Sequence, residues 1–205
     1  MKNIDIAGKD KIIEAAKIVV SKHGVNKATV REIAKEAELS TGAIYHYYKS
    51  KEEILYDLLD QSLRVTTTIA EKSQNENEDN KELIQDIYHA TLERFYKKTE
   101  SRLQFHLMNE IVTGNGELKE KFQEKYNEWI TRIEEILKNV YGLNSHELSR
   151  PLATWIIASV DGVVLQSLLD NGEEDLNGMF KVLEILVHEG LPHFIGLINQ
   201  HAKRA

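Results

Sequence analysis

The chain has 205 residues, which is enough for one domain or two small ones with a well-formed hydrophobic core. Its 26 Lys and Arg residues face 33 Asp and Glu residues, and the net charge of −7 argues against nucleic-acid binding by the chain taken as a whole. Because the chain contains no cysteine, disulfide scaffolds, thiolate metal sites, cysteine nucleophiles and thiol redox sensors are excluded.

The first segment, residues 1–11, mixes charged residues with two isoleucines and lacks the uninterrupted apolar stretch of a signal peptide. The longest apolar tract, residues 152–169, has Asp161 near its centre, and a charge at that depth is costly in a bilayer. We therefore expect a soluble cytoplasmic protein with no membrane partner.

Apolar residues recur with a helical period in the first third of the chain, and strand-like alternation is nowhere sustained. Three helices are predicted there from three apolar stripes: Ile12, Ala16, Val19 and Val20; Val30, Ile33, Ala34 and Ala37; and Ile54, Leu55, Leu58, Leu59 and Leu63.

Two pairs of residues fit the capping box that opens a helix, Thr29 with Glu32 and Ser50 with Glu53. Between them the run 38–42 breaks the helical pattern, and Ser40 or Thr41 can cap a new short helix. The predicted order is a helix, a short turn, a short helix and then a long helix.

Residues 71–80 contain no apolar side chain and are predicted to form a loop or a frayed helix end. Beyond them we expect helices at about 81–98, 100–113, 117–141, 149–170 and 175–189, with a short last helix at about 191–202. The predicted fold is all-α: a three-helix, helix-turn-helix head in residues 1–51, running into a connecting helix to about residue 70, and a larger helical bundle in residues 52–205.

Charge is divided unevenly between these two regions. Residues 1–51 hold ten basic and six acidic residues, a net charge of +4, whereas residues 52–205 hold 16 basic and 27 acidic residues, a net charge of −11. A small basic head on an acidic helical body indicates that only the head meets a polyanion.

The short helix predicted at 41–48 has an apolar side and a side of small and polar residues. At about 100° per residue, Ile44 and Tyr48 point toward the preceding helix. The opposite arc holds the small or polar residues Gly42, Ala43 and His46, flanked by Tyr45 and Tyr47 and followed by Lys49 and Lys51. Small residues allow close approach to a groove, while phenols and lysines can donate to phosphates. The alternative is that the tyrosines only pack a small core and the lysines are solvated.

The residues in this region resemble the N-terminal signature of the TetR family of bacterial transcriptional regulators. The resemblance covers about a quarter of the chain. It rests on the run 12–16, on Gly24, Thr29, Ile33, Ala34 and Ala37, and on the run 40–53. Tyr47 and Tyr48 depart from it, because the family often has His and Phe at these positions.

The resemblance implies a homodimeric, ligand-responsive DNA-binding regulator, most simply a repressor that a small-molecule effector releases from a palindromic operator. The expected DNA-binding residues are Thr29, Ser40, Thr41, Gly42, Ala43, Tyr45, His46, Tyr47 and Lys51. Of these, the resemblance places Thr41, Gly42, Ala43 and His46 toward bases, and Thr29, Tyr45, Tyr47 and Lys51 toward phosphates.

The tract at 152–169 is apolar nearly all round, and the helix at 175–189 is apolar over more than one stripe. In TetR-like proteins the corresponding helices pair with their twins, so the resemblance implies a dimer interface formed by the helices at about 149–170 and 175–189. The alternative is a single buried core helix in a monomer.

An effector pocket is expected among the middle helices, since small-molecule sites combine aromatic and apolar residues with a few polar groups. The candidate lining residues are Phe95, Phe105, His106, Met108, Asn109, Trp129, Trp155 and Asp161. Ordinary core packing is the competing explanation for the aromatic residues and Met108.

No enzyme chemistry, cofactor or metal site is predicted. His188-Glu189 begins like a zinc-protease helix, but Pro192 stands where the second histidine should be, and Gly114-Asn115-Gly116 lacks the other residues of a phosphate-binding loop. The competing hypothesis to a DNA-binding regulator is an all-helical interaction or ligand-storage module that no longer binds DNA.

Overall fold

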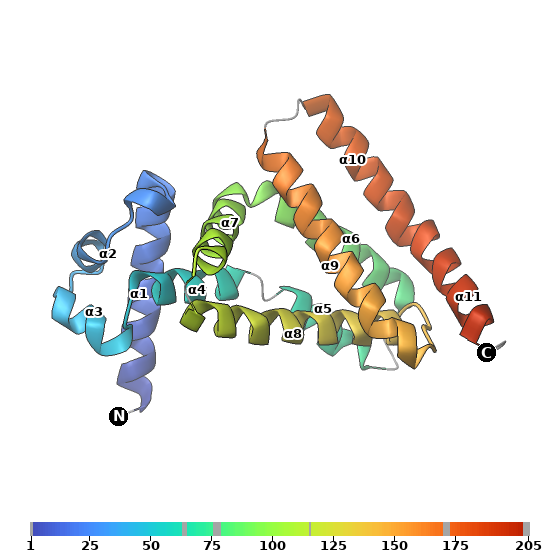
Figure 1. Ribbon diagram of the computed structural model, residues 1–205, viewed down its shortest axis with the longest axis horizontal. Coiled ribbons are helices and arrows are strands. Elements are labelled where there is room, and N and C mark those ends of the chain that lie inside the picture. The colour runs from blue at the N-terminus through green and yellow to red at the C-terminus, as the bar shows by residue number, and fades with distance from the viewer. Residues whose placement is uncertain (1, 63–64, 76–78, 115, 170–172, 203–205) are drawn as a thin grey trace. The chain divides into compact units, whose positions relative to one another are not determined.

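The computed structural model describes residues 2–62, 65–75, 79–114, 116–169 and 173–202, and every regular element within these ranges is a helix (Figure 1). The all-α prediction is therefore confirmed. The helices are α1 (Lys2–His23), η1 (Val25–Lys27), α2 (Val30–Glu36), α3 (Thr41–Tyr47), α4 (Lys51–Ser62), α5 (Val65–Ser73), α6 (Asn80–Tyr96), α7 (Lys98–Val112), α8 (Gly116–Asn139), α9 (His146–Leu168), α10 (Glu173–Ile185), η2 (Leu186–Gly190) and α11 (Leu191–Ala202).

The chain forms two compact units. The first comprises residues 1–63 and 99–122, and the second comprises residues 64–98 and 123–205. Most of α7 and the first residues of α8 thus belong to the unit that contains the N-terminal helices, although they lie far along the sequence. The functional division predicted after residue 51 remains a prediction, because compactness is a different criterion from function.

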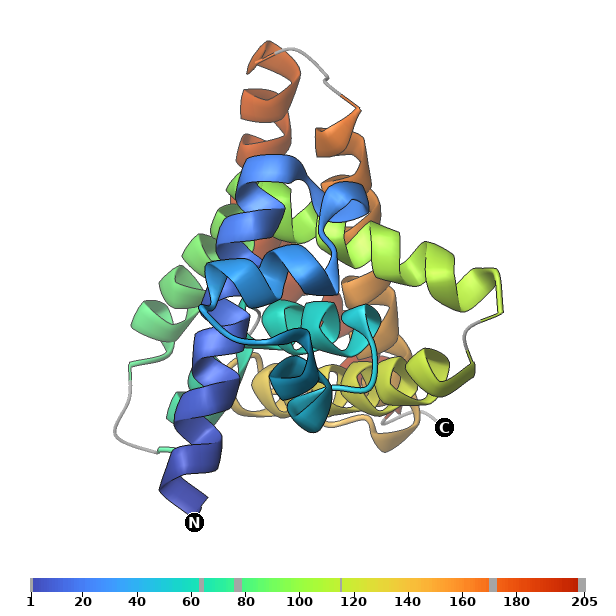
Figure 2. The same cartoon turned by 90° about the vertical axis from the view of Figure 1, so that its left-hand side faces the viewer.

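In the first unit, α1 contacts α2, α3 and α4, and α2 contacts α3. Figure 2 shows α2 crossing in front of α1. The apolar stripes predicted from the sequence form the core: Ile12, Ala16, Ile33, Ile44, Ile54 and Leu55 are fully buried. Leu63, the last member of the third stripe, lies outside the described residues.

The turn between α2 and α3 uses a left-handed residue. Glu38 has φ of 52°, and the amide of Leu39 donates to the carbonyl of Ala34 at 2.9 Å, which closes the end of α2. A non-glycine residue in this conformation carries a backbone cost, which the packing of α2 and α3 around the turn offsets. The break predicted at 38–42 is therefore present.

The connecting helix predicted to run to about residue 70 is helical wherever it is described, as α4, which ends at Ser62, and α5, from Val65 to Ser73. Residues 63 and 64 lie outside the described residues, so a single continuous helix remains a prediction. The polar run expected at 71–80 begins inside α5, since the helix continues through three polar residues before it ends. Residues 76–78 of this run lie outside the described residues.

The second unit has two apolar clusters. The first joins α8, α9 and α11 through Leu137, Leu143, Leu152, Ala153, Ile195 and Ile198. The second joins α5, α6 and α8 through Ile69, Ala70, Leu83, Ile136 and Val140. Helix α6 also contacts α9, α10 and η2.

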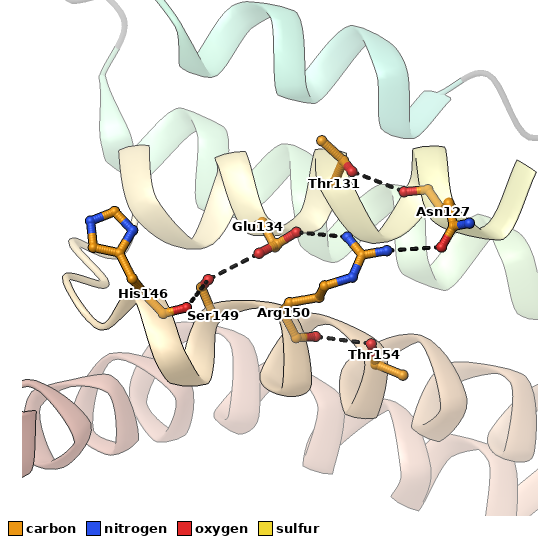
Figure 3. Close-up of polar contacts among 7 residues, drawn as sticks. All are labelled: Asn127, Thr131, Glu134, His146, Ser149, Arg150 and Thr154. Atoms are coloured by element: carbon orange, nitrogen blue, oxygen red, sulfur yellow. Dashed lines mark hydrogen bonds and ion pairs between the residues drawn. The ribbon is translucent and has the colours of Figure 1, made fainter. Parts of the chain in front are cut away.

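Polar contacts fix the start of α9 against α8 (Figure 3). The Arg150 guanidinium donates to Glu134 Oε2 at 3.2 Å and to Asn127 Oδ1 at 2.8 Å, and the Ser149 hydroxyl donates to Glu134 Oε1 at 2.9 Å. Ser145 caps α9 by accepting from the amide of Leu148. These bonds fix the orientation of the apolar helix α9 relative to α8.

Helix α9 is long and apolar enough to cross a membrane by length and composition alone. Its central charge, Asp161, forms an ion pair with Arg94 of α6 within the second unit.

Candidate nucleic-acid interface and effector region

The start of α3 exposes the surface predicted to read DNA. Ser40 caps the helix, because its hydroxyl accepts from the amide of Ala43 at 3.1 Å. Ser40, Thr41 and Gly42 are exposed, Ala43 is half-buried, and Ile44 on the opposite side is fully buried. The predicted division of α3 into an inward and an outward side therefore matches its burial.

The two flanking tyrosines differ in their surroundings. Tyr45 is 57% exposed, so its hydroxyl is accessible to a phosphate. Tyr47 is half-buried, and its ring lies against Gly8 of α1: a Cβ atom on Gly8 would stand 2.6 Å from Tyr47 Cζ. The ring of the exposed His46 lies nearly perpendicular to the Tyr47 ring, with 5.3 Å between centroids. Tyr47 thus packs α3 against α1 and supports the His46 ring. Its phosphate contact remains a prediction.

The inward-facing tyrosine, Tyr48, is buried and donates to Asp57 Oδ2 at 3.0 Å. Burial and the neighbouring Asp57 carboxylate raise the pKa of the Tyr48 phenol far above its ordinary value. Tyr48 therefore stays neutral and packs inward, as predicted for this position.

A capping box opens α2 as predicted. The Thr29 hydroxyl accepts from the Glu32 amide at 3.2 Å, and Glu32 Oε2 accepts from the Thr29 amide at 3.1 Å. The remaining amides of this first turn, at the positive end of the helix dipole, are suited to one phosphate.

The start of α4 has a related arrangement with one difference from the prediction. Ser50 accepts from the Glu53 amide at 3.2 Å, but the Glu53 carboxylate accepts from the amide of Lys49, at 2.7 Å. Lys51 begins α4, with its ammonium 3.9 Å from the Glu52 carboxylate and its side chain 22% exposed. The phosphate contact predicted for Lys51 would replace that weak ion pair.

The eight candidate pocket residues fall into two sets. Phe105, His106, Met108 and Asn109 lie on α7 in the first unit, and Phe95, Trp129, Trp155 and Asp161 lie on α6, α8 and α9 in the second. The second set is itself divided, because Phe95 and Trp129 are buried whereas Trp155 is 67% exposed. Contact of any of these residues with an effector remains a prediction.

Asp161 is the centre of a polar cluster in the second unit. Its carboxylate accepts from Arg94 at 2.6 Å and from the Tyr126 hydroxyl at 2.9 Å, and the Tyr126 ring meets that of Trp129 at 4.9 Å between centroids. Arg94 and Tyr126 are not among the site residues predicted from the sequence. Each is a polar residue on an amphipathic helix, and no local pattern indicates a partner 67 or 35 residues away.

His106 has an unusual environment on α7. Its Nε2 atom is buried and has no hydrogen-bond partner among the described residues. Burial, together with the nearby Lys51 ammonium, lowers the pKa of the imidazole, although Glu110 and Glu52 act in the opposite direction.

Helix α9 carries an exposed apolar stripe that continues just past its end. The members recur every three or four residues, and all are exposed: Leu148, Pro151, Trp155, Ala158, Gly162, Leu165 and Leu169. On α10 and η2 the exposed apolar residues are Val182, Ile185 and Leu186, and on α11 they are Phe194 and Leu197. A monomer of this size rarely leaves so many large apolar side chains in water.

Across the described ranges, no group of three or more His, Asp or Glu side chains is placed to hold a metal ion.

Comparison with known proteins places these features among bacterial regulators. Residues 12–58 match the family model described as bacterial regulatory proteins, tetR family. The chain is 27% identical over 184 residues to the fatty acid metabolism regulator protein of Bacillus subtilis, covering 86% of this chain and 92% of that protein. It is 28% identical over 120 residues to the HTH-type transcriptional regulator QacR of Staphylococcus aureus, covering 58% of this chain and 64% of that protein.

Among solved structures, the fatty acid degradation regulator FadR from Bacillus halodurans is similar over 90% of this chain and 96% of its own, with a TM-score of 0.67 and 26% identity. The similarity therefore extends beyond the N-terminal helices to nearly the whole fold.

Proposed function

We infer that this chain, which belongs to the TetR family of bacterial regulatory proteins, is a DNA-binding regulator of transcription that responds to a small-molecule ligand. The observation that carries the DNA-binding function is the exposed first turn of α3, where Thr41, Gly42 and Ala43 leave room for a groove. Tyr45, Lys51 and the capped start of α2 supply donors for phosphate oxygens.

In this proposal the residues fall into two groups, one that approaches bases and one that holds phosphates. Thr41, Gly42, Ala43 and His46 approach base edges, which gives sequence readout. Tyr45, Lys51 and the α2 amides beside Thr29 hold phosphates and fix the register without reading sequence. The head, with a net charge of +4, supplies the attraction that the acidic remainder of the chain lacks.

The exposed stripe of α9 and the exposed residues of α10 support the predicted homodimer. A three-four spacing of apolar residues is the pattern that a partner helix covers at a shallow crossing angle. Ala158 and Gly162, in the middle of the stripe, allow two copies of α9 to approach closely. A dimer presents two heads, as expected for a palindromic site with half-sites about 34 to 36 Å apart.

The effector is proposed from the chain's whole-length relatives. Two proteins similar over most of this chain carry names that connect them with fatty acid metabolism or degradation. Fatty acids and their thioesters are therefore the first compounds to test. By favouring one of two arrangements of the dimer, such a ligand would release the operator, and the protein would then act as a repressor. Its proposed place of action is the cytoplasm.

The test begins with selection of bound duplexes from a random DNA pool, followed by fluorescence anisotropy with the selected duplex. We expect saturable binding that weakens steeply with salt and that decreases in the Tyr45→Phe and Lys51→Ala variants. Lys138→Ala, on an exposed position of α8, is the matched control and should retain wild-type affinity.

Addition of fatty acids or fatty acyl thioesters to the complex should then release the duplex. Failure to select any duplex from the pool would favour the interaction or storage module instead.

A further inference from the structure

The Glu53 carboxylate is hydrogen-bonded to the short segment between α3, which is the reading helix of the proposed function, and α4. Its Oε2 atom accepts from the amide of Lys49 at 2.7 Å, two residues after the end of α3, and its own amide donates to Ser50 Oγ at 3.2 Å. The position of the 49–51 segment, and hence of the Lys51 ammonium, therefore depends on where this carboxylate is held.

The other oxygen of the same carboxylate is bonded to a residue much later in the chain. Lys121 Nζ, from the first part of α8, lies 2.5 Å from Glu53 Oε1. The Glu53 side chain is only 16% exposed and that of Lys121 36%, so solvent screens this pair less than an ordinary surface pair.

The contacts also affect the charge state of Glu53. Burial by itself would raise the pKa of this carboxyl, but the hydrogen bonds from Lys121 and from the Lys49 amide, with the charges of the two lysines, lower it overall. Glu53 is therefore ionised at neutral pH, and the charge-assisted bond to Lys121 is in place.

Lys121 is fixed at its backbone as well as at its ammonium. Its carbonyl oxygen accepts from the Tyr56 hydroxyl at 3.2 Å, one turn further along α4. The ring of the next residue, Phe122, packs at an angle of 61° to the Tyr56 ring, with 5.4 Å between centroids. All of these residues belong to the first compact unit, so the first part of α8 belongs to the packing around α4.

We propose that Lys121 is a positioning residue for DNA recognition: through Glu53 it holds the 49–51 segment in the place that lets α3 and Lys51 engage DNA. Lys121 itself does not contact DNA. The inference rests on the proposed function and names, within it, a determinant of affinity that lies outside the range 12–58 matched by the family model.

The test compares three variants with the wild-type protein on a duplex that the wild type selects from a random pool. Lys121→Gln should weaken binding about three- to tenfold, in the range expected for loss of a partly shielded charge-assisted bond. Lys121→Arg, which keeps the cation, should restore most of the affinity. Lys119→Gln, which removes the same charge from an exposed position of the same helix, should bind like wild type.

Salt dependence separates positioning from direct contact. Loss of a phosphate contact reduces the slope of log K against log salt by about one, as we expect for Lys51→Ala. Lys121→Gln should lower the affinity without changing this slope. Glu53→Gln should reproduce that effect, and the Lys121→Gln, Glu53→Gln double variant should be no weaker than either single variant.

Two outcomes overturn the proposal: equal affinities for Lys121→Gln and Lys119→Gln, or a slope for Lys121→Gln that falls by about one. Circular dichroism of each variant checks that the helices are intact. If the wild-type protein selects no duplex at all, the proposed function fails first and the inference fails with it.

Discussion

Gly8 and Tyr47 show how a single close approach supports the reading helix. The Tyr47 ring occupies the space where a side chain at position 8 would begin, and His46 rests against the same ring. Glycine in the middle of a helix is otherwise unfavourable, by about 1 kcal/mol relative to alanine. Its presence in α1 is explained by the packing of Tyr47.

Gly8→Ala should therefore destabilise the protein by about 1 kcal/mol through overpacking, despite the better helix propensity of alanine, and it should weaken operator binding. The control is Gly196→Ala in α11, where the new Cβ meets no described neighbour within 4 Å, and which should be neutral or stabilising. Urea unfolding measures the stability of both variants, and fluorescence anisotropy measures operator binding. Stabilisation by Gly8→Ala would contradict the packing role of Tyr47.

The lowered pKa of His106 predicts how the free energy of unfolding depends on pH. Its pKa in the folded protein is below the ordinary value of 6.5, so between these two values the unfolded chain binds a proton that the folded chain does not. The contribution of His106 to stability is complete above pH 6.5 and is lost as the pH falls through the folded pKa. Lys51, Glu52 and Glu110 are the charged groups that act on it.

Urea unfolding at about pH 7.5 and about pH 5.5 tests this expectation. The free energy of unfolding should decrease at the lower pH, and His106→Gln, which cannot titrate, should make the decrease smaller. His201→Gln, on an exposed position of α11, serves as the control. An identical decrease in wild type and His106→Gln would show that other groups cause it.

At the scale of the helices, two ion pairs that join α6 to other helices differ in their exposure to solvent. Arg94 and Asp161 are 21% and 15% exposed and join α6 to α9, whereas Lys72 and Asp86 are 46% and 43% exposed and join α5 to α6. Asp161→Ala should destabilise the protein by about 2 to 3 kcal/mol, because it leaves a shielded guanidinium and the Tyr126 hydroxyl without this acceptor.

Asp86→Ala is the matched control and should cost less than about 1 kcal/mol, because solvent screens the exposed pair. Chemical denaturation gives both values. Equal losses would mean that the Asp161 cluster contributes no more than a surface ion pair.

The same helices show what the sequence can predict. Local signals are sufficient for the helical class, the cap at Thr29, a cap at Ser40 or Thr41 and the inward side of α3, because each depends on residues within one or two turns. The structure shows that Ser40 is the cap. The pairs Arg94–Asp161 and Lys121–Glu53 span 67 and 68 residues, and no periodic pattern encodes them. Aromatic residues such as Trp155 suit both pockets and interfaces, and only exposure in the folded chain separates these two roles.

At the scale of the whole molecule, the exposed apolar side chains predict the oligomeric state. Val182→Glu and Ile185→Glu each place a charge among the exposed apolar residues of α10, and burying that charge in an interface is unfavourable. We expect each variant to shift sedimentation from dimer to monomer and to lose operator affinity. Lys181→Glu, an exposed neighbour, should remain dimeric. Dimers of all three variants would place the interface elsewhere.

The division of charge also predicts that the acidic body weakens binding to DNA of unrelated sequence. The net charge of +4 lies in residues 1–51, and the net charge of −11 in the rest repels DNA from the body. Replacing the exposed acids Glu120 and Glu124 with Lys should raise affinity for a duplex of unrelated sequence by about two- to tenfold at low salt. The gain should shrink near 0.15 M salt, where screening acts over about 8 Å. Replacing the same acids with Gln should give a smaller gain, and an unchanged nonspecific affinity at low salt in both variants would show that the acidic surface does not repel DNA.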